Sequence, residues 1–267
     1  MTSYRYQPGN QPVLMSIPHV ATEIPADIAA RMTVAGKAVP DTDWHLERLY
    51  DFAAELGIGV LQAVYSRYVI DLNRAPDGKP LYPGTSNTEL VPTSTFASHN
   101  IYVQGEAPDD NEIAERCATH WLPYHDCLAR ELSALKGKHG IAVLFDCHSI
   151  RSHVPRFFEG KLPDFNLGTA SNSSCASELR DRLSATLAGH GDYTLAVDGR
   201  FKGGYITRHY GQPQEGIHAF QLELSLATYM NEDPPFDYEA ALAAKVRPAL
   251  RAMLEAALDW ASSKSVR

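Results

Sequence analysis

The stretch IAVLFDCHSI, residues 141–150, joins an apolar run directly to Asp146, Cys147 and His148. The run has the length and character of a strand that is covered on both faces, which is typical of the centre of a parallel sheet. Ligands of such sheets bind beyond the carboxyl ends of the strands. Because side chains alternate along a strand, we expect Asp146 and His148 on one side and Cys147 on the other. The stretch therefore predicts a parallel sheet with an acid and an imidazole at its ligand-binding edge.

The composition is that of an ordinary globular chain. Its 267 residues are 44% hydrophobic and 21% charged, which suffices for a sizeable core. The mean hydropathy of -0.26 and the lack of an apolar run of membrane length argue against a membrane protein. The net charge of -8 argues against nucleic acid as a partner, because phosphate binding requires a basic surface.

We expect the protein to act in the cytoplasm. The first residues, MTSYRYQPGN, contain no apolar segment of the kind found in secretory signals. The four cysteines form no C-x-x-C pair and no dense framework, which fits a reducing compartment.

Short apolar runs predict strands, and apolar residues spaced three or four apart predict helices. The predicted strands cover residues 13–18, 59–65, 68–73, 141–149, 193–198, 205–210 and 218–224. The predicted helices cover residues 43–57, 109–137, 174–188 and 238–262. This alternation predicts one α/β domain over residues 1–267, in which a mostly parallel, mixed central sheet lies between helices on both faces. Residues 74–108 are predicted to form a long irregular loop, and loops of that length are commonly functional.

Several predicted strands end in residues that bind metals or carry charge. One such residue can simply be the hydrogen-bond partner of a loop, and a lone buried glutamate can belong to a core ion pair. The same pattern on several strands indicates a shared site, because the carboxyl ends of parallel strands meet at one edge. The residues are His19 in SIPHVATEIP (16–25), Asn73 and Arg74 in YVIDLNRAP (68–76), His148, and Glu223 in AFQLELSLA (219–227).

These residues include the usual ligands of a catalytic metal. Two histidines and a carboxylate around an open position are typical of catalytic zinc. We expect His19 and His148 to bind a divalent metal, with zinc as the first choice. The carboxylate ligand stays open between Glu23, on the same loop as His19, and Asp43, whose alternative role is a helix N-cap. Asp41 is a weaker candidate.

The remaining polar residues suit the hydrolysis of an anionic substrate. Zinc makes a bound water more acidic, and Glu223 is placed to accept the proton and to pass it to a leaving amine. Arg67, Asn73 and Arg74 suit a small anionic molecule, since arginine binds carboxylates with two N–H groups. Asn73 and Arg74 can both face the site only if their strand breaks there, which the nearby Pro76 favours.

A second anion contact is predicted in RFKGGYITRHYGQP, residues 200–213. Lys202 and Arg208 are the candidate cations, and the glycine pair Gly203-Gly204 lets the backbone approach a ligand closely. The alternative is a glycine turn before a strand, with both charges in solvent.

An ordered set of motifs resembles the N-formylglutamate amidohydrolase family. The resemblance extends from about residue 11 to residue 262, and it implies metal-dependent hydrolysis of N-formyl-L-glutamate to formate and L-glutamate in histidine degradation. The motifs are SIPHVATEIP, DTDWH, SRYVIDLNRAPDG, DCHSI, FKGGYITRHYGQP and FQLELSLATYM.

The same order of residues is distantly similar to zinc carboxypeptidases and aspartoacylase-type deacylases. That similarity implies a three-layer fold of the zinc-exopeptidase or phosphorylase/hydrolase type. It also implies a role for each matching residue: His19 and His148 on zinc, Glu223 as the base, Arg67 on the reacting carbonyl, and Asn73 with Arg74 on the substrate carboxylate. The wider group has H-x-x-E at its first ligands, whereas Glu23 lies one residue further on, so Asp43 remains a candidate.

Three other functions are compatible with the residues. A related deacylase would act on another N-acyl amino acid. A non-catalytic protein would bind acidic metabolites through its arginines. A thiol enzyme would use Cys147 as the nucleophile beside His148, although strand alternation points their side chains to opposite faces.

Overall fold

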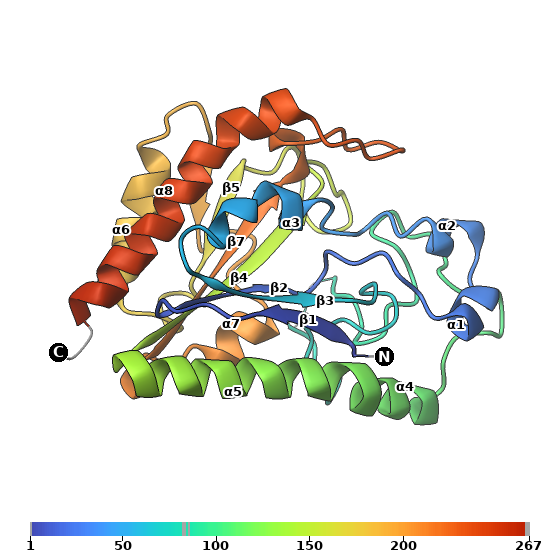
Figure 1. Cartoon of the computed structure of the whole chain (residues 1–267). Coiled ribbons are helices and arrows are strands. Elements are labelled where there is room, and N and C mark those ends of the chain that lie inside the picture. Colours follow the sequence, from blue (N-terminus) through green and yellow to red (C-terminus); the bar gives the residue numbers. More distant parts are fainter. Residues whose placement is uncertain (1, 82–83, 85, 265–267) are drawn as a thin grey trace.

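The computed structural model describes residues 2–81, 84 and 86–264 and is built around one seven-stranded sheet (Figure 1). The strands are β1 (Tyr4–Gln7), β2 (Val13–Ile17), β3 (Gly59–Ala63), β4 (Ala142–Ile150), β5 (Phe165–Gly168), β6 (Leu195–Val197) and β7 (Ile217–Ser225). Their order is β1-β3-β2-β4-β7-β5-β6. The four strands β3, β2, β4 and β7 are parallel, while β1 and β5 run antiparallel to their neighbours β3 and β7. The predicted mixed, mostly parallel sheet is confirmed.

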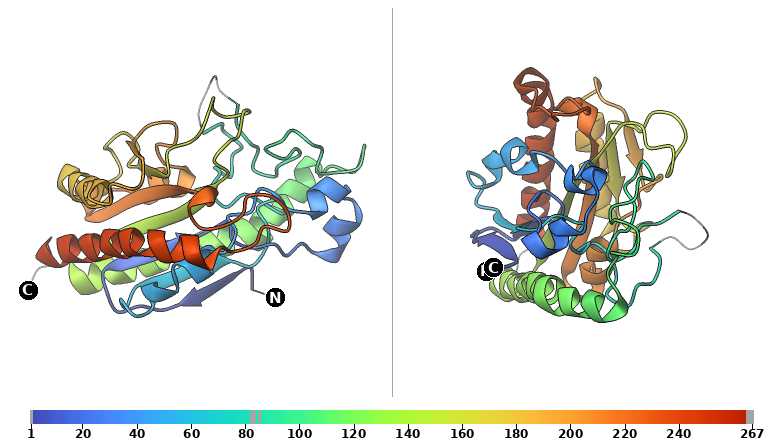
Figure 2. Two further views of the ribbon diagram at one scale, coloured as in Figure 1. Left: turned by 90° about the horizontal axis from the view of Figure 1, so that it is seen from above. Right: turned by 90° about the vertical axis from the view of Figure 1, so that its right-hand side faces the viewer.

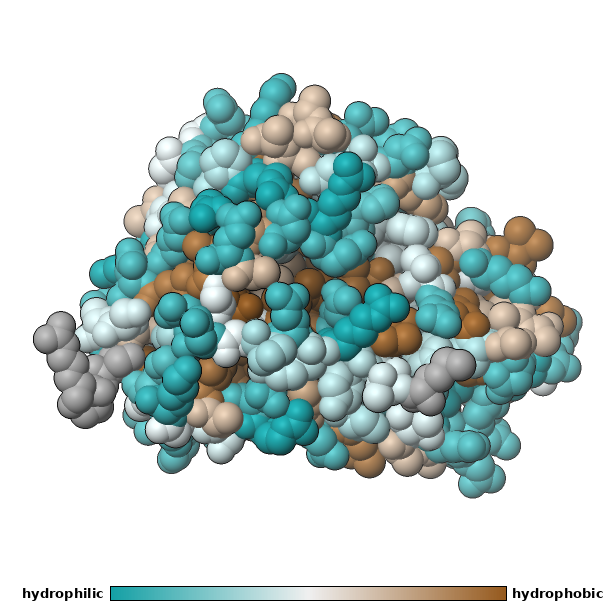
Figure 3. All heavy atoms as spheres, in the orientation of Figure 1, coloured by the Kyte–Doolittle hydropathy of each residue, from teal (hydrophilic) through white to brown (hydrophobic). Residues whose placement is uncertain are grey.

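Helices cover both faces of this sheet. They are α1 (Ala26–Ala30), α2 (Val34–Lys37), α3 (Leu46–Leu49), α4 (Asp110–Arg116), α5 (Leu122–His139), α6 (Ser177–Ala188), α7 (Tyr205–Tyr210) and α8 (Ala240–Lys264). The end-on view in Figure 2 shows α8 and α5 on opposite sides of the strands. Two apolar cores result: one joins the sheet to α6 and α8, and the other joins it to α5. The surface in Figure 3 is mostly hydrophilic, with hydrophobic side chains showing chiefly between polar ones.

Strand β4 divides its side chains between the two cores as alternation requires. Phe145 and Cys147 belong to the core under α8, and Leu144 belongs to the core over α5. Asp146 and His148 therefore emerge on the α5 side. Cys147 is fully buried and points away from His148, so this geometry does not support a thiol nucleophile.

Two predicted strands are wrong. Residues 68–73 form turns, and the buried carboxylate of Asp71 accepts the backbone N–H of Asn73 there. Residues 205–210 form α7, although their β-branched and aromatic residues favour a strand. A tertiary contact outweighs this preference, since the N–H of Ile206 at the start of α7 bonds to the side chain of Asn73.

Two predicted helices differ in detail. Residues 43–57 contain only α3 and a 3-10 turn, and Asp43 caps neither of them: its carboxylate lies 3.0 Å from Nδ1 of His148. Residues 109–137 are helical as predicted, but a π-helical turn, Cys117–Trp121, precedes Pro123 and accommodates its missing N–H. The elements β1, β5, α1 and α2 have no counterpart among the predicted ones, because all are too short for a periodic signal. Among the described residues, no helix is long and apolar enough to cross a membrane.

Candidate active site

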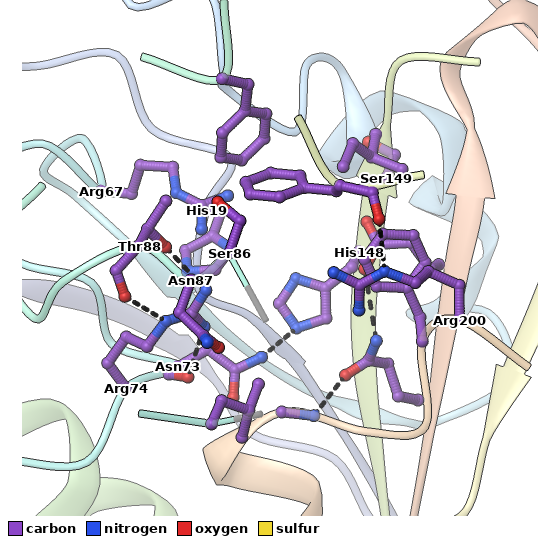
Figure 4. A pocket seen from close by; sticks show the side chains of 18 residues that line it. His19, Arg67, Asn73, Arg74, Ser86, Asn87, Thr88, His148, Ser149 and Arg200 are labelled. Carbon is purple, nitrogen blue, oxygen red and sulfur yellow. Dashed lines mark hydrogen bonds between the residues drawn. The ribbon is translucent and has the colours of Figure 1, made fainter. Parts of the chain in front are cut away.

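A cavity opens at the carboxyl ends of the parallel strands (Figure 4). Five parts of the chain line it: the ends of β4 and β7, the turns after β2 and β3, the irregular segment 74–108, the loop after β4 and the loop after β6. The lining residues include His19, Arg67, Asn73, Arg74, Ser86, Asn87, Thr88, Phe96, His148, Ser149, Phe157, Arg200, Phe201, Gly204, Gln221 and Glu223. The described part of 74–108 contains no helix or strand longer than an isolated bridge. It supplies one wall of the cavity.

His19 and His148 line this cavity, and Asp43 converges with them. All three are buried, and one ligand atom from each lies within 4.8 Å of the others. The carboxylate oxygen Oδ2 of Asp43 is 3.0 Å from Nδ1 of His148 and 3.8 Å from Nδ1 of His19. Two imidazole nitrogens and a carboxylate oxygen are a common donor set for zinc and similar divalent ions. The group could therefore hold a metal ion.

The other nitrogen of each imidazole lies close to a second carboxylate. Nε2 of His19 lies 2.7 Å from Asp71, and Nε2 of His148 lies 3.0 Å from Asp146. Metal-binding histidines commonly donate their second N–H to a carboxylate, as Nε2 of His19 is placed to do with Asp71, which fixes the tautomer and leaves Nδ1 for the metal. Both Nδ1 atoms here face Asp43.

The two imidazoles differ electrostatically. Burial and the neighbouring Arg67 lower the pKa of His19, outweighing the carboxylates beside it. Burial also acts to lower the pKa of His148, but the charges of Asp146 and Asp43 outweigh it and hold that pKa well above its usual value. A cation at Nδ1 of His148 would take the place of the proton that these carboxylates stabilise.

Asp71 ties the metal-binding group to Arg67. Its second oxygen accepts Nη2 of Arg67 at 2.6 Å, and Nη1 of Arg67 is 3.9 Å from Asp43. Burial acts to raise the pKa of Asp71, but Arg67 and His19 outweigh it and hold that pKa well below its usual value. The Asp71 carboxylate has no exposed surface, and its neighbours favour the ionised form. The residue types alone do not single it out, although an aspartate inside the apolar run YVIDLN is a usable signal.

Glu223 lies beside this group on β7. It pairs in register with His148 of β4, so both side chains project from the same face. Burial raises the pKa of Glu223 to about 8, assisted by the negative charge of Asp43 and opposed by His148. The side-chain amide of Gln221 donates to Glu223 at 3.3 Å and accepts the N–H of Gly204 at 2.8 Å.

Asn73 and Arg74 both line the cavity, because the chain turns there. The amide of Asn73 is engaged inside the protein: Nδ2 lies 2.8 Å from Nε2 of His148 and 3.2 Å from Asp146. Arg74 is half-buried, and its guanidinium donates twice to Thr88, through the carbonyl oxygen and Oγ1. The guanidinium of Arg74 is thus oriented at the cavity wall, whereas the amide of Asn73 is bonded to residues inside the protein.

Other predicted residues lie outside this group. Glu23 is exposed and meets Tyr65 through its backbone, so Asp43 and not Glu23 completes the set of potential ligands. Asp41 is buried elsewhere, where it accepts the N–H of Phe96 and the hydroxyl of Tyr68.

The two cations of the predicted second anion contact do not line the cavity. Lys202 and Arg208 are absent from the described lining of the cavity, and Arg208 is exposed on α7. Arg200, two residues before Lys202, lines the cavity instead. Arg200 lies in a loop without periodicity, so the sequence could not show which of Arg200, Lys202 and Arg208 lines the cavity.

The fold and the site together define an α/β protein with a buried His–Asp–His group, suited to a metal ion, and a carboxylate of raised pKa beside it. Residues 11–230 match the family model of N-formylglutamate amidohydrolase, and the chain belongs to that family. The resemblance inferred from the motifs is confirmed.

Two curated relatives are similar to this chain over almost its whole length. An N-formylglutamate deformylase of Pseudomonas aeruginosa is 49% identical over 255 residues and covers 96% of each chain. An N-formylglutamate deformylase of Pseudomonas putida is 45% identical over 262 residues and covers 98% of each. The crystal structure of an N-formylglutamate amidohydrolase from Ralstonia eutropha JMP134 has the same fold, with a TM-score of 0.81, 21% identity and 98% coverage of each chain.

Proposed function

We propose that the protein is a metal-dependent deformylase, with zinc as the first choice of metal, that hydrolyses N-formyl-L-glutamate to formate and L-glutamate. The names and the high identity of the two Pseudomonas relatives support the reaction. The convergence of His19, Asp43 and His148 supports the metal.

The charges around these residues suit a bound cation. Three buried aspartates, Asp43, Asp71 and Asp146, outnumber the buried guanidinium of Arg67 beside them. Buried charges are costly unless they are compensated, so a divalent cation would relieve this excess of negative charge. A divalent metal held by the three ligands would polarise the formyl carbonyl and make a water molecule more acidic.

The chain supplies the groups for the proton transfers. Glu223 accepts a proton from the attacking water as the water oxygen bonds to the formyl carbon. Arg67, fixed by Asp71, donates to the carbonyl oxygen as negative charge develops there. When the C–N bond breaks, Glu223 returns the proton to the leaving nitrogen, and formate and glutamate separate.

The substrate is held by the wall of the cavity. Arg74 binds a carboxylate of the substrate, oriented by its hydrogen bonds to Thr88. Asn73 holds His148 and Asp146 in position. Its Nδ2 contacts both residues, and its Oδ1 accepts the N–H of Ile206.

One observation carries the proposal: the pairing of His148 with Glu223 places a base of raised pKa next to the metal-binding group. The test is metal analysis of the purified protein, combined with formate release from N-formyl-L-glutamate before and after chelation. We expect bound divalent metal, formate release, loss of release on chelation and its recovery with zinc. Full turnover in a metal-free preparation would refute the metal dependence, and a metal-loaded protein that releases no formate would refute the reaction.

A further inference from the structure

We infer that Arg200 binds the side-chain carboxylate of the substrate and so makes the site selective for a dicarboxylic N-formyl amino acid. This inference rests on the proposed function. N-formylglutamate carries two carboxylates, and burying each of them requires a cationic or strongly donating partner. Arg74 accounts for one carboxylate, and Arg67 is committed to the reacting carbonyl.

Arg200 has a defined position in the cavity wall. It lies in the loop that follows β6 and lines the same cavity as His148 and Glu223. Its Nε donates to the carbonyl oxygen of Phe157 at 2.7 Å, and its guanidinium carbon lies 5.4 Å from the centre of the Phe201 ring. A guanidinium oriented by a backbone acceptor and an aromatic ring loses little further freedom when it binds a carboxylate.

The geometry across the cavity matches a substrate with two anionic ends. Figure 4 shows Arg74, with Asn73 and Thr88, on one side and Arg200 on the opposite side, where His148 and Ser149 lie. A molecule whose amide sits over the catalytic residues can therefore place one carboxylate at each arginine.

The aromatic rings near Arg200 strengthen this contact. Phe157 and Phe201 both line the cavity, and Phe96 packs edge-on against Phe157 with ring centroids 4.9 Å apart. An apolar surrounding excludes water and strengthens an ion pair formed beside it. It also suits the methylene groups between the two carboxylates of glutamate.

The test compares three substrates that differ only in their carboxylates. N-formyl-L-glutamine keeps the size of the side chain but lacks its charge. N-formyl-4-aminobutyrate keeps that carboxylate and lacks the α-carboxylate. Steady-state kcat/KM is measured with these two compounds and with N-formyl-L-glutamate, for the wild-type protein and for the variants Arg200→Gln and Arg74→Gln.

We expect Arg200→Gln to lower kcat/KM for N-formyl-L-glutamate by about 10- to 100-fold, the loss typical of one charged hydrogen-bonding partner, mainly through KM. The same variant should change kcat/KM for N-formyl-L-glutamine much less. Arg74→Gln should show the complementary pattern, with a large loss for N-formyl-L-glutamine and a small one for N-formyl-4-aminobutyrate.

The matched controls separate Arg200 from its neighbours. Arg182→Gln removes an exposed charge on α6 and should leave all three values unchanged. Lys202→Gln and Arg208→Gln remove the other cations of the same segment. If either of these, and not Arg200→Gln, abolishes the preference for N-formyl-L-glutamate, or if Arg200→Gln affects all substrates equally, the inference is wrong.

Calorimetry of glutarate binding tests the role of Arg200 separately from hydrolysis of N-formyl-L-glutamate. Glutarate has both carboxylates and no amide, so its binding does not require hydrolysis. Weaker binding to Arg200→Gln than to the wild type supports the subsite even if N-formyl-L-glutamate is not hydrolysed, in which case only the proposed function fails. Equal binding to both proteins, together with normal hydrolysis, overturns the subsite and leaves the proposed function standing.

Discussion

His148 and Glu223 occupy directly paired positions on the neighbouring parallel strands β4 and β7. The two residues are far apart in the chain, yet the register of one strand pair places an imidazole and a carboxylate side by side in the lining of the cavity. Rigid strands hold such groups more exactly than loops do, which suits a site that must move protons. The proposed base and one potential metal ligand are thus positioned by the centre of the sheet.

The choice of carboxylate ligand can be tested by a pair of substitutions. Asp43→Ala removes the oxygen that faces both Nδ1 atoms, so we expect metal content to fall from about one ion per chain towards none, with loss of activity. Glu23→Ala should retain metal, because Glu23 is exposed and lies outside the group. Metal analysis of both proteins provides the measurement, and the opposite result would restore Glu23 as the ligand.

Asp71 is predicted to act through His19 and Arg67. The isosteric change Asp71→Asn keeps the packing but removes the anion that orients both groups. We expect metal affinity to fall by about 10- to 100-fold, as is usual when the carboxylate behind a metal-binding histidine is lost. Competition with a chromophoric chelator measures the affinity. Asp51→Asn, which changes an exposed carboxylate on the 3-10 turn, is the control, and equal affinities for the two variants would contradict the role of Asp71.

Glu223→Gln should abolish proton transfer without disturbing the fold. We expect kcat to fall by about 100- to 10,000-fold, the usual contribution of a general base, while metal content stays normal. Glu215→Gln, at an exposed position, is the matched control. Turnover within a few-fold of wild type in the Glu223 variant would exclude this residue as the base.

The pH profile should reflect the same carboxylate. Only ionised Glu223 can accept a proton, so kcat/KM should fall about tenfold per pH unit below its pKa. Burial raises that pKa to about 8, and a cation near His148 lowers it again, which places the acidic limb between the usual value of 4.5 and about 8. Initial rates from pH 4 to 9 at constant metal saturation measure the limb. A profile that is flat through this interval would contradict the assignment.

Gly204 is predicted to be required for packing against Asn73. A Cβ at this position would lie within 2.2–2.5 Å of the Asn73 amide, so Gly204→Ala must displace a buried side chain that contacts His148. We expect a loss of about 1–3 kcal/mol in the free energy of unfolding, together with reduced activity. Gly137→Ala is the control: a Cβ there meets nothing within 4 Å, and alanine in a helix should add about 0.5–1 kcal/mol. Denaturant unfolding of both variants provides the values, and an unaffected Gly204→Ala protein would show that Asn73 can move.

The sequence by itself determined the central features of this protein. The apolar run before Asp146 and His148 predicted a central parallel strand, and alternation placed Cys147 on the other face, as the structure has it. The ordered motifs predicted the family, which the comparisons confirm. These features depend on local periodicity and short motifs, which are visible without long-range contacts.

Only the tertiary structure decided how the loops complete the site. It brought Asp43 and not Glu23 to the two histidines, placed Asp71 behind His19, and put Arg200 in the cavity wall. It also turned residues 205–210 into a helix against their local preference. Loops and turns take their conformation from hydrogen bonds to distant residues, and those partners are known only once the chain has folded around its sheet.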